Sequence, residues 1–366
     1  MTNKVAKLNK LLPFVAIGTI ADAQSVVEPT NRLLIKSGIQ VLNNSKLFFG
    51  LEDLIEKLGV REKMLSGYQI DSQDLAFLLS PILNASGRIS HAKLSIQTLI
   101  NTNYNQTENL ATKLIQVNTD RKNLVKEYLD NINFEVDQQL KQNKKLIWLV
   151  GDWNKGIVGL MASRILNQTN LPVAVLSISE SEVTGSFRAP NGYNLPEALN
   201  KCSDLLIKFG GHPQAAGFTA KLENVSQLAE SLEKVFSTSL DLSQADPNQL
   251  KQINLNIQDI SSLFFAKILI LDPFGIDFPV PTILLKAKDL EKYDKKDMSG
   301  GKHIKMTVKD VDIIFFNLET TFKEQLIGGK FSQNTNLEFN IGKNFWNGKL
   351  SYQLIFQRVN NLSIKA

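Results

Sequence analysis

The sequence predicts an α/β protein with a long connecting helix and a C-terminal β-barrel. Three observations support this prediction. An uninterrupted amphipathic pattern runs over residues 106–142, strands alternate with helices over 143–240, and short strands with glycine turns fill 250–362. Residues 1–105 contain further apolar segments and form a first region ahead of the long helix.

The composition is that of a soluble globular protein, with 366 residues of which 43% are hydrophobic and 21% charged. A net charge of +5 is compatible with a polyanionic partner without requiring one. The single cysteine, Cys202, excludes an internal disulfide and a cysteine-based zinc site, and is typical of a reducing cytoplasm. We expect no signal peptide and no membrane helix, because the apolar run at 13–18 is too short.

The first region offers two candidate functional residues. A largely apolar segment at 12–21, either helical or a strand, ends at Asp22, which is either a turn cap or a catalytic carboxylate. Residues 31–36 suit a short helix that stops near Gly38. Arg88 follows a small glycine-containing turn, from which a guanidinium can reach a phosphate; a plain surface arginine is the alternative.

The middle region alternates strands and helices, which favours a sheet with parallel pairing. Ser186 and Arg188 lie at the end of its third strand. We expect strands at 146–150, 172–176, 183–188 and 217–220, and helices at 157–167, 195–207 and 225–236.

The most informative segment is the loop expected at 208–218, Lys-Phe-Gly-Gly-His-Pro-Gln-Ala-Ala-Gly-Phe. Gly210 and Gly211 allow the backbone to approach a ligand or to adopt a positive φ. His212 follows them and is one of only three histidines. Backbone N–H groups and an imidazole suit an anion, above all a phosphate. The alternative is a tight turn into a strand, with His212 as an ordinary buried histidine.

The C-terminal region has the size of a five-stranded OB-type barrel. Its expected strands are 280–287, 303–309, 312–316, 337–341 and 350–358. Aromatic residues there could stack on the bases of a single strand, and lysines could neutralise its phosphates. The candidates for such a surface are Lys286, Lys288, Lys302, Lys305, Phe315, Phe316, Tyr352 and Phe356. The alternative is that the aromatic rings belong to the core and the lysines are simply solvated.

The motifs, in their order along the chain, resemble those of the RecJ-type exonucleases of the DHH/DHHA1 phosphoesterase family. They lie at 18–22, 83–88, 153–164, 185–188, 208–218, 272–275 and 345–348. This resemblance, which runs from about residue 11 to about 358, implies four parts. They are a C-terminal remnant of the DHH domain (1–105), a connector helix (106–142), a DHHA1 domain (143–240) and an OB-like barrel (250–362).

The resemblance also implies an activity, the hydrolysis of single-stranded DNA from its 5′ end during repair and recombination, with manganese or magnesium. Asp22 matches a metal-binding aspartate of the DHH domain. His212, with Gly210 and Gly211, matches the segment that grips the phosphate, and it is the candidate catalytic residue. The remaining expected DNA contacts are Ser186, Arg188 and Arg88, with a weaker contribution from Lys286, Lys288 and Lys305.

The chain also departs from the family pattern. The 21 residues before Asp22 contain neither an aspartate nor a histidine, where the family has further aspartates and an Asp-His-His triplet. One carboxylate cannot hold a two-metal site. Asn154 replaces a common histidine, and Phe187 replaces a usual glycine.

These departures leave three hypotheses. The first is a nuclease fragment that needs a separate polypeptide carrying the missing ligands. The second is a non-catalytic module that binds single strands through the DHHA1 surface and the barrel. The third is a relative acting on short oligoribonucleotides or nucleotide phosphates, and the barrel argues against it.

Overall fold

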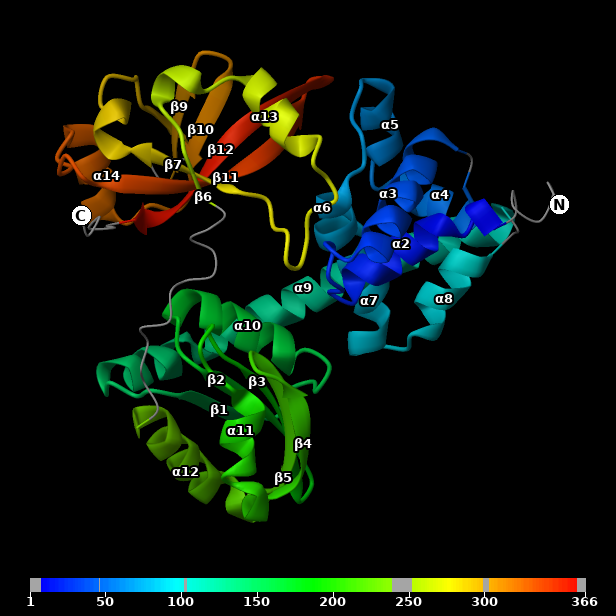
Figure 1. The fold of residues 1–366 in the computed structure, drawn as a ribbon. Coiled ribbons are helices and arrows are strands. Elements are labelled where there is room, and N and C mark those ends of the chain that lie inside the picture. The colour runs from blue at the N-terminus through cyan, green and yellow to red at the C-terminus, as the bar shows by residue number, and fades with distance from the viewer. Residues whose placement is uncertain (1–7, 46, 102–103, 239–251, 299–302, 361–366) are drawn as a thin grey trace. The chain divides into compact units, whose positions relative to one another are not determined.

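The computed structural model describes residues 8–45, 47–101, 104–238, 252–298 and 303–360. The chain divides into two compact units (Figure 1). Unit 1 joins Met1–Ser80 to Pro247–Ala366, and unit 2 is Pro81–Asp246. Within the described ranges, no helix is both long and apolar enough to cross a membrane.

Unit 1 begins with a group of short helices. They are α2 (Leu12–Ala21), α3 (Pro29–Asn44), α4 (Phe49–Lys57), α5 (Val60–Leu65), α6 (Ser72–Asp74) and a π-helical turn, η1 (Leu75–Leu79). The prediction that a helix stops near Gly38 is wrong, because α3 continues to Asn44. Gly38 instead lets α2 and α3 approach closely: a Cβ atom there would collide with the carbonyl of Leu12 and lie 2.5 Å from the Cβ of Ala16.

The rest of unit 1 is the barrel region. It contains β6 (Gln252–Asn254), α13 (Ser262–Leu269), β7 (Thr282–Lys286), β8 (Lys296–Met298), β9 (His303–Val308), β10 (Val311–Phe315), α14 (Thr320–Gly328), β11 (Asn336–Trp346) and β12 (Lys349–Asn360). The described strands form one sheet in the order β6-β7-β11-β12-β10-β9-β8. All five predicted strands are present, extended by the short strands β6 and β8. Neither α13 nor α14 was predicted.

The aromatic residues of the barrel are mostly core. Phe315 is fully buried, and its ring lies 5.1 Å from that of Phe356. Tyr352 is half-buried against the same core, whereas Phe316 is 46% exposed. The predicted stacking surface is therefore wrong for Phe315, because its ring fills the barrel interior. Lys302 lies outside the described residues.

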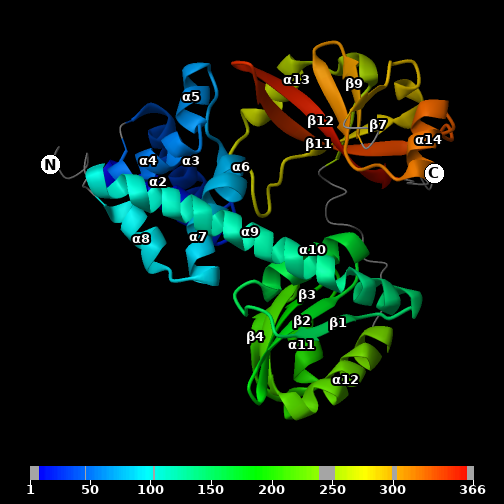
Figure 2. The same cartoon turned by 180° about the vertical axis from the view of Figure 1, so that it is seen from behind.

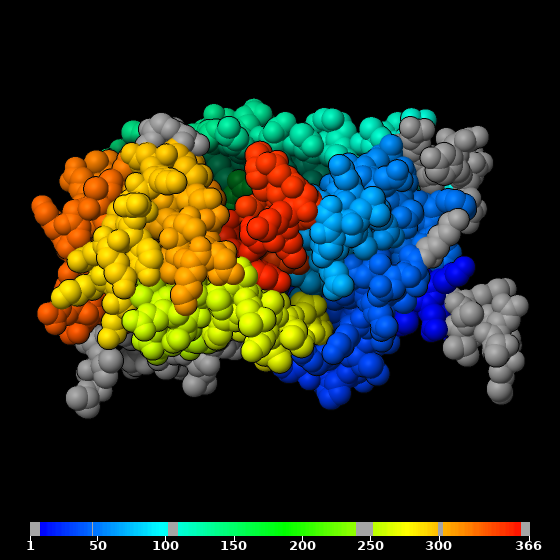
Figure 3. Space-filling model, turned by 90° about the horizontal axis from the view of Figure 1, so that it is seen from above, coloured from blue at the N-terminus to red at the C-terminus, as the bar shows by residue number. Residues whose placement is uncertain are grey.

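Two short motifs join the barrel to the helices inside unit 1. The loop at 272–275 is held by Asp272, whose carboxylate accepts hydrogen bonds from the hydroxyl (2.6 Å) and amide (3.3 Å) of Ser72. Arg32 of α3 donates to the carbonyls of Leu271 and Pro273. The turn at 345–348 places Phe345 edge-on to Tyr68, with ring centroids 6.1 Å apart. Figure 3 shows this red end of the β11–β12 hairpin against the blue N-terminal segment.

Unit 2 combines helices with a second sheet. Its helices are α7 (Ser80–Ile89, entering from unit 1), α8 (Lys93–Ile100), α9 (Tyr104–Lys141), α10 (Val158–Thr169), α11 (Leu195–Asn200) and α12 (Val225–Thr238). Its strands are β1 (Ile147–Gly151), β2 (Val173–Ser179), β3 (Glu182–Arg188), β4 (Leu206–His212) and β5 (Ala215–Lys221), in the order β1-β2-β3-β5-β4. The predicted parallel pairing of β1 with β2 is confirmed.

The long helix is also confirmed. α9 runs for 38 residues without a break, which corresponds to about 57 Å at 1.5 Å per residue. Its apolar stripe, including Val125, Leu129 and Ile132, is buried against α10 and the sheet. Burial of this stripe, rather than helix propensity alone, stabilises so long a helix.

The sheet of unit 2 is the middle layer of three (Figures 1 and 2). Side chains of β2 alternate between two cores, as the two-residue period of a strand requires. Ala174 and Leu176 pack with α11 and α12, whereas Val173 and Val175 pack with α9 and α10. Paired residues of neighbouring strands point to the same face of the sheet. Each side chain of β3 therefore faces the same helices as the β2 residue paired with it.

Three local predictions in unit 2 are wrong. Arg88 does not follow a turn, because α7 continues through it to Ile89. The helix expected at 195–207 ends at Asn200, and the chain enters β4 at Leu206. The segment 208–218 is not a loop but a hairpin of β4 and β5, in which the two strands pair in register from Phe209 to His212.

Candidate phosphate-binding site

Four arginine side chains from four elements of unit 2 come together on one side of the sheet. Arg188 lies at the end of β3, Arg164 on α10, Arg121 on α9 and Arg88 on α7. Burial and then the charge of Arg88 lower the pKa of Arg188 below its ordinary value. Burial, Arg88 and Arg164 likewise lower the pKa of Arg121. Electrostatic repulsion therefore links Arg88 with Arg188 and with Arg121, and Arg164 with Arg121. We call this set the arginine cluster.

Ser186 and Arg188 form the part of the cluster that lies on the sheet. In the register of the sheet they oppose Val175 and Val173, so their side chains face α9 and α10. An Nη1 of Arg188 donates to the Ser186 hydroxyl at 3.0 Å and to the Phe187 carbonyl at 2.8 Å. Phe187 itself points to the opposite core and is fully buried there. Its presence instead of a glycine therefore leaves the arginine face unchanged.

The start of α10 lies directly over these two side chains. A Cβ atom at Gly159 would be 3.0 Å from both the Ser186 hydroxyl and a guanidinium nitrogen of Arg188. A side chain at that position would compete with the arginine for space. Glycine there thus keeps room for the arginine and serine side chains, which provide charged and neutral hydrogen-bond donors for an oxyanion.

Arg88 is positioned by the turn before α10. Its Nη1 donates to the Gly156 carbonyl at 3.3 Å, and a Cβ atom at Gly156 would collide with the Arg88 carbonyl. The Asn154 side chain accepts a hydrogen bond from the Gly156 amide at 2.9 Å and shapes this turn. Asn154 therefore has a local structural contact at the position where the family commonly has a histidine.

Arg121 and Arg164 were not identified from the sequence. Arg121 donates from two nitrogens to the side-chain oxygen of Asn118, which is buried, at 3.2 and 3.0 Å. Arg164 is exposed on α10. The one sequence signal for them is that each lies on a helix expected to pack beside the sheet. The spacing between the two arginines does not predict that they come close, because this depends on how the helices pack.

No carboxylate ion pair with any of these four arginines is found in the described part of unit 2. Uncompensated like charges destabilise a fold unless a ligand of opposite charge binds. A phosphate offers oxygens to several guanidinium forks at once. The arrangement is therefore suited to a phosphate or a chain of phosphates.

The hairpin residues continue the same face of the sheet. Ser186 opposes Gly217 on β5, which opposes Gly210 on β4. Arg188 similarly opposes Ala215, which opposes His212. Two strand spacings separate the backbones of Arg188 and His212, or about 10 Å. His212 is exposed, so the alternative of a buried histidine is wrong.

The two adjacent glycines of the hairpin have different roles. Gly211 has φ of +145°, and a Cβ atom there would lie 2.6 Å from the Cα of Ala216. A Cβ atom at Gly210 would meet nothing within 4 Å. Gly211 is therefore required by the backbone. Gly210 leaves open, solvent-facing space at its end of the row of paired residues Gly210, Gly217 and Ser186, which runs across three strands.

Asp22 lies in unit 1, exposed at the C-terminal end of α2. One of its carboxylate oxygens accepts a hydrogen bond from the Gln24 amide at 2.7 Å. Among the described residues there is no group of three or more histidine, cysteine or acidic side chains that fits a metal ion. Asp22 can serve as one ligand, but the described residues do not complete a manganese or magnesium site.

The three barrel lysines are also in unit 1. Lys286 and Lys288 are exposed at the end of β7 and just beyond it. Lys305 on β9 forms an ion pair with Asp312 at 2.7 Å, so its charge is locally compensated. Because β11, β12 and β10 lie between β7 and β9 in the sheet, the lysines do not form a continuous row along neighbouring strands.

Comparison with known proteins assigns a family to each of the two predicted domains. Residues 143–238 match the DHHA1 domain, and residues 252–358 match the RecJ OB domain. These matches cover the sheet of unit 2 and the barrel of unit 1. The expected domain boundaries within residues 1–142 stay a prediction.

The relatives share one description. The single-stranded-DNA-specific exonuclease RecJ of Bacillus subtilis is 31% identical over 359 residues, which is 95% of this chain and 44% of the relative. RecJ of Thermus thermophilus is 26% identical over 346 residues, covering 93% of this chain and 46% of the relative. The chain thus spans about half the length of these relatives.

A solved structure has the same fold. The crystal structure of RecJ from Thermus thermophilus in complex with Mn²⁺ superposes with a TM-score of 0.74 at 23% identity. The match covers 96% of this chain and 50% of the other. A second structure of the same protein, with Mg²⁺, gives a TM-score of 0.72.

Proposed function

Because this chain belongs to the RecJ family through its DHHA1 and RecJ OB domains, we propose that it holds the backbone of single-stranded DNA for exonucleolytic hydrolysis from the 5′ end. The observation that carries this proposal is the arginine cluster, in which Arg188 contacts Ser186 and none of the four arginines has a described carboxylate ion pair. Phosphodiester groups supply the missing negative charge, and binding them relieves the repulsion.

Each predicted residue takes a defined part in this proposal. Arg188 and Arg88 bind phosphate oxygens, and Ser186 donates its hydroxyl to the same group. The open space at Gly210 lets the DNA strand lie on the sheet. His212, at the hairpin end, donates a hydrogen bond to the phosphate and is the residue of this chain that we place nearest to the reaction. Gly211 holds the histidine in place through the backbone.

Hydrolysis needs more than this chain's described residues supply. Asp22 offers a single carboxylate, and the metal-activated water of a two-metal hydrolase requires several. We therefore propose that a further polypeptide segment carries the remaining ligands. Manganese or magnesium, when bound there, would activate water and neutralise the phosphate. Without that segment the chain acts as a single-strand-binding module.

The binding part of the proposal is tested by fluorescence anisotropy with a labelled oligothymidylate. Arg188→Ala should weaken binding by about tenfold or more, because a charge-assisted phosphate contact is lost. It should also lower the salt slope of the affinity by about one ion. Lys201→Ala is the control, because Lys201 is an exposed lysine of the same unit at the end of α11. Equal affinity of wild type and Arg188→Ala would contradict the phosphate site.

The catalytic part requires a second measurement. The chain is mixed with a polypeptide carrying the Asp-His-His motif, and the release of nucleotides from 5′-ended single strands is followed with added manganese. We expect degradation in the mixture, none with this chain alone, and loss of activity with His212→Ala. Binding without degradation in the mixture would favour the non-catalytic alternative.

A further inference from the structure

A cavity in unit 1 lies beside Asp22 but belongs neither to the arginine cluster nor to the hairpin. Its volume is about 500 Å³, within the range of pockets that hold small organic molecules. Its walls come from the C-terminal end of α2, from α6 and η1, from the 274–280 loop, and from β7 and β11. The helical part and the barrel part of unit 1 thus build it together.

The lining of this cavity is apolar with a few amide groups. Most of it is aliphatic or aromatic, including Ile20, Phe274 and Ile341. Glu338 is the one charged residue among the described lining residues. Its carboxylate already accepts hydrogen bonds from Gln252 and from Arg358, each at 3.0 Å. The site therefore has no free positive charge for a phosphate, and its ligand must be neutral where it is enclosed.

Phe77 forms an exposed aromatic wall. Its side chain is 77% exposed, although it lines the cavity. It is carried by the π-helical turn η1, where the Ser80 hydroxyl donates to the Leu75 carbonyl at 2.6 Å. Such turns interrupt the regular helical spacing and often occur at functional sites. An exposed phenylalanine beside a cavity is suited to stacking against a flat ring.

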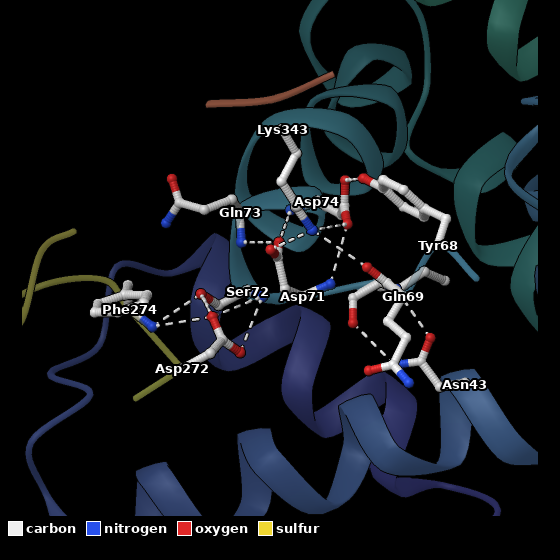
Figure 4. A network of polar contacts seen from close by, with 11 residues as sticks. Asn43, Tyr68, Gln69, Asp71, Ser72, Gln73, Asp74, Asp272, Phe274 and Lys343 are labelled. Carbon is white, nitrogen blue, oxygen red and sulfur yellow. Dashed lines mark hydrogen bonds and ion pairs between the residues drawn. The ribbon is translucent and has the colours of Figure 1, made fainter. Parts of the chain in front are cut away.

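Two amide side chains, Gln73 and Asn340, have no described hydrogen-bond partner at the cavity. Figure 4 shows the Gln73 amide turned away from the carboxylates of Asp71 and Asp74. An amide offers both a donor and an acceptor. An aliphatic ligand would bury these groups without partners, at a cost in free energy. A planar ring with donors and acceptors on its edge would satisfy them.

We propose that this cavity binds one nucleobase, stacked on Phe77 and hydrogen-bonded at its edge by Gln73 and Asn340. The proposal deepens the proposed function, since the base would belong to the bound single strand with its phosphates outside the cavity. Gln24 lines the cavity and also donates to the Asp22 carboxylate at 2.7 Å. A base in the cavity would therefore contact Gln24, the side chain that holds the candidate metal ligand Asp22 in place.

The proposal is tested on the full chain with free thymidine and deoxyadenosine, which carry no phosphate. Saturation-transfer NMR should show stronger transfer to the base protons than to the sugar protons. Phe77→Ala should reduce the signal several-fold, because the stacking surface is lost. Phe134→Ala is the matched control, since Phe134 is 73% exposed on helix α9 and should leave the signal unchanged.

A second variant fills the cavity instead of removing a contact. Ala76→Phe adds a ring to the lining and should reduce the nucleoside signal by about tenfold, since its ring occupies the ligand space. Thermal melting checks that both variants remain folded. Absence of signal with the wild-type chain, or full signal with Ala76→Phe, would overturn the base pocket.

The same samples separate this inference from the proposed function. Arg188→Ala should weaken oligonucleotide binding and keep the nucleoside signal, whereas Ala76→Phe should reduce the nucleoside signal and keep most of the phosphate-dependent binding. If the wild-type chain does not bind the oligonucleotide, the proposed function is overturned. The nucleoside signal would still show whether the cavity binds a base.

Discussion

The two units contain contrasting groups of charged residues. In unit 1, Lys343 of β11 forms ion pairs with Asp71 (2.5 Å) and Asp74 (3.7 Å), and its ammonium lies 4.7 Å from the ring centre of Tyr68 (Figure 4). In unit 2, the arginine cluster brings charges of one sign together with no described carboxylate. The first group pairs its one ammonium with both carboxylates, whereas no described ion pair compensates the second, which under the proposed function takes an external anion.

The contrast separates charges that are paired inside the fold from charges that are not. Asp71 and Asp74 also form a reciprocal capping box at the start of α6, and Tyr68 donates to Asp74 at 2.6 Å. Every member of that network has a partner inside unit 1, so it joins the barrel to the helices. The cluster in unit 2 gives no such internal benefit. Burial alone would not separate the two groups; the signs and the pairing of their charges do.

The largest effect is expected for Lys343→Met. Removing the cation leaves two neighbouring carboxylates uncompensated, and we expect a loss of about 3 kcal/mol in the free energy of unfolding. Urea denaturation measures this loss. The control is Lys349→Met, an exposed lysine on the same hairpin, which should change stability little. By contrast, Arg188→Ala should not lower stability, because it relieves like-charge repulsion. Equal stability of Lys343→Met and wild type would remove the contrast between the units.

The two hairpin glycines give the next largest effect. Gly211→Ala should destabilise unit 2 by about 2 kcal/mol, because alanine is strained at φ of +145° and its methyl group meets the opposite strand. Gly210→Ala should keep stability near that of the wild type and weaken oligonucleotide binding, since the methyl group enters open space on the sheet face proposed to hold the DNA. Thermal melting and anisotropy on the same pair of variants check both statements. A stable Gly211→Ala chain would argue against the backbone role.

The smallest effect concerns pH and Asp272. Burial raises the pKa of Asp272 above its ordinary value of 3.8, Ser72 partly offsets this by hydrogen bonding, and Asp71 adds to it. A carboxyl whose folded pKa is raised contributes stability below its unfolded pKa, and that contribution disappears as the pH rises through the folded pKa. Wild type should therefore lose stability relative to Asp272→Asn between about pH 4 and pH 7. If the melting temperatures of wild type and Asp272→Asn change by the same amount between the two pH values, this prediction is refuted.

The sequence predicted part of the candidate phosphate-binding site. Ser186, Arg188 and Arg88 were chosen because arginine forks and hydroxyls suit phosphates, and the structure brings them to one place. Arg121 and Arg164 were missed, because each is an ordinary arginine on an amphipathic helix until the packing of α9 and α10 shows which face it shares. The cavity beside Asp22 was missed for the same reason, since its walls are separated by as many as 321 positions, from Ile20 to Ile341.

The sequence by itself determined the order of the parts, because periodicity and turn residues are local properties. It predicted the long helix, the parallel β1–β2 pair and the five main barrel strands. Only the tertiary structure decided how Gly38, Gly210 and Gly211 are used, because a glycine can serve a turn, a close approach or open space equally well. The tertiary structure also decided which charges are neutralised, since pairing depends on distances between residues that are remote in the chain.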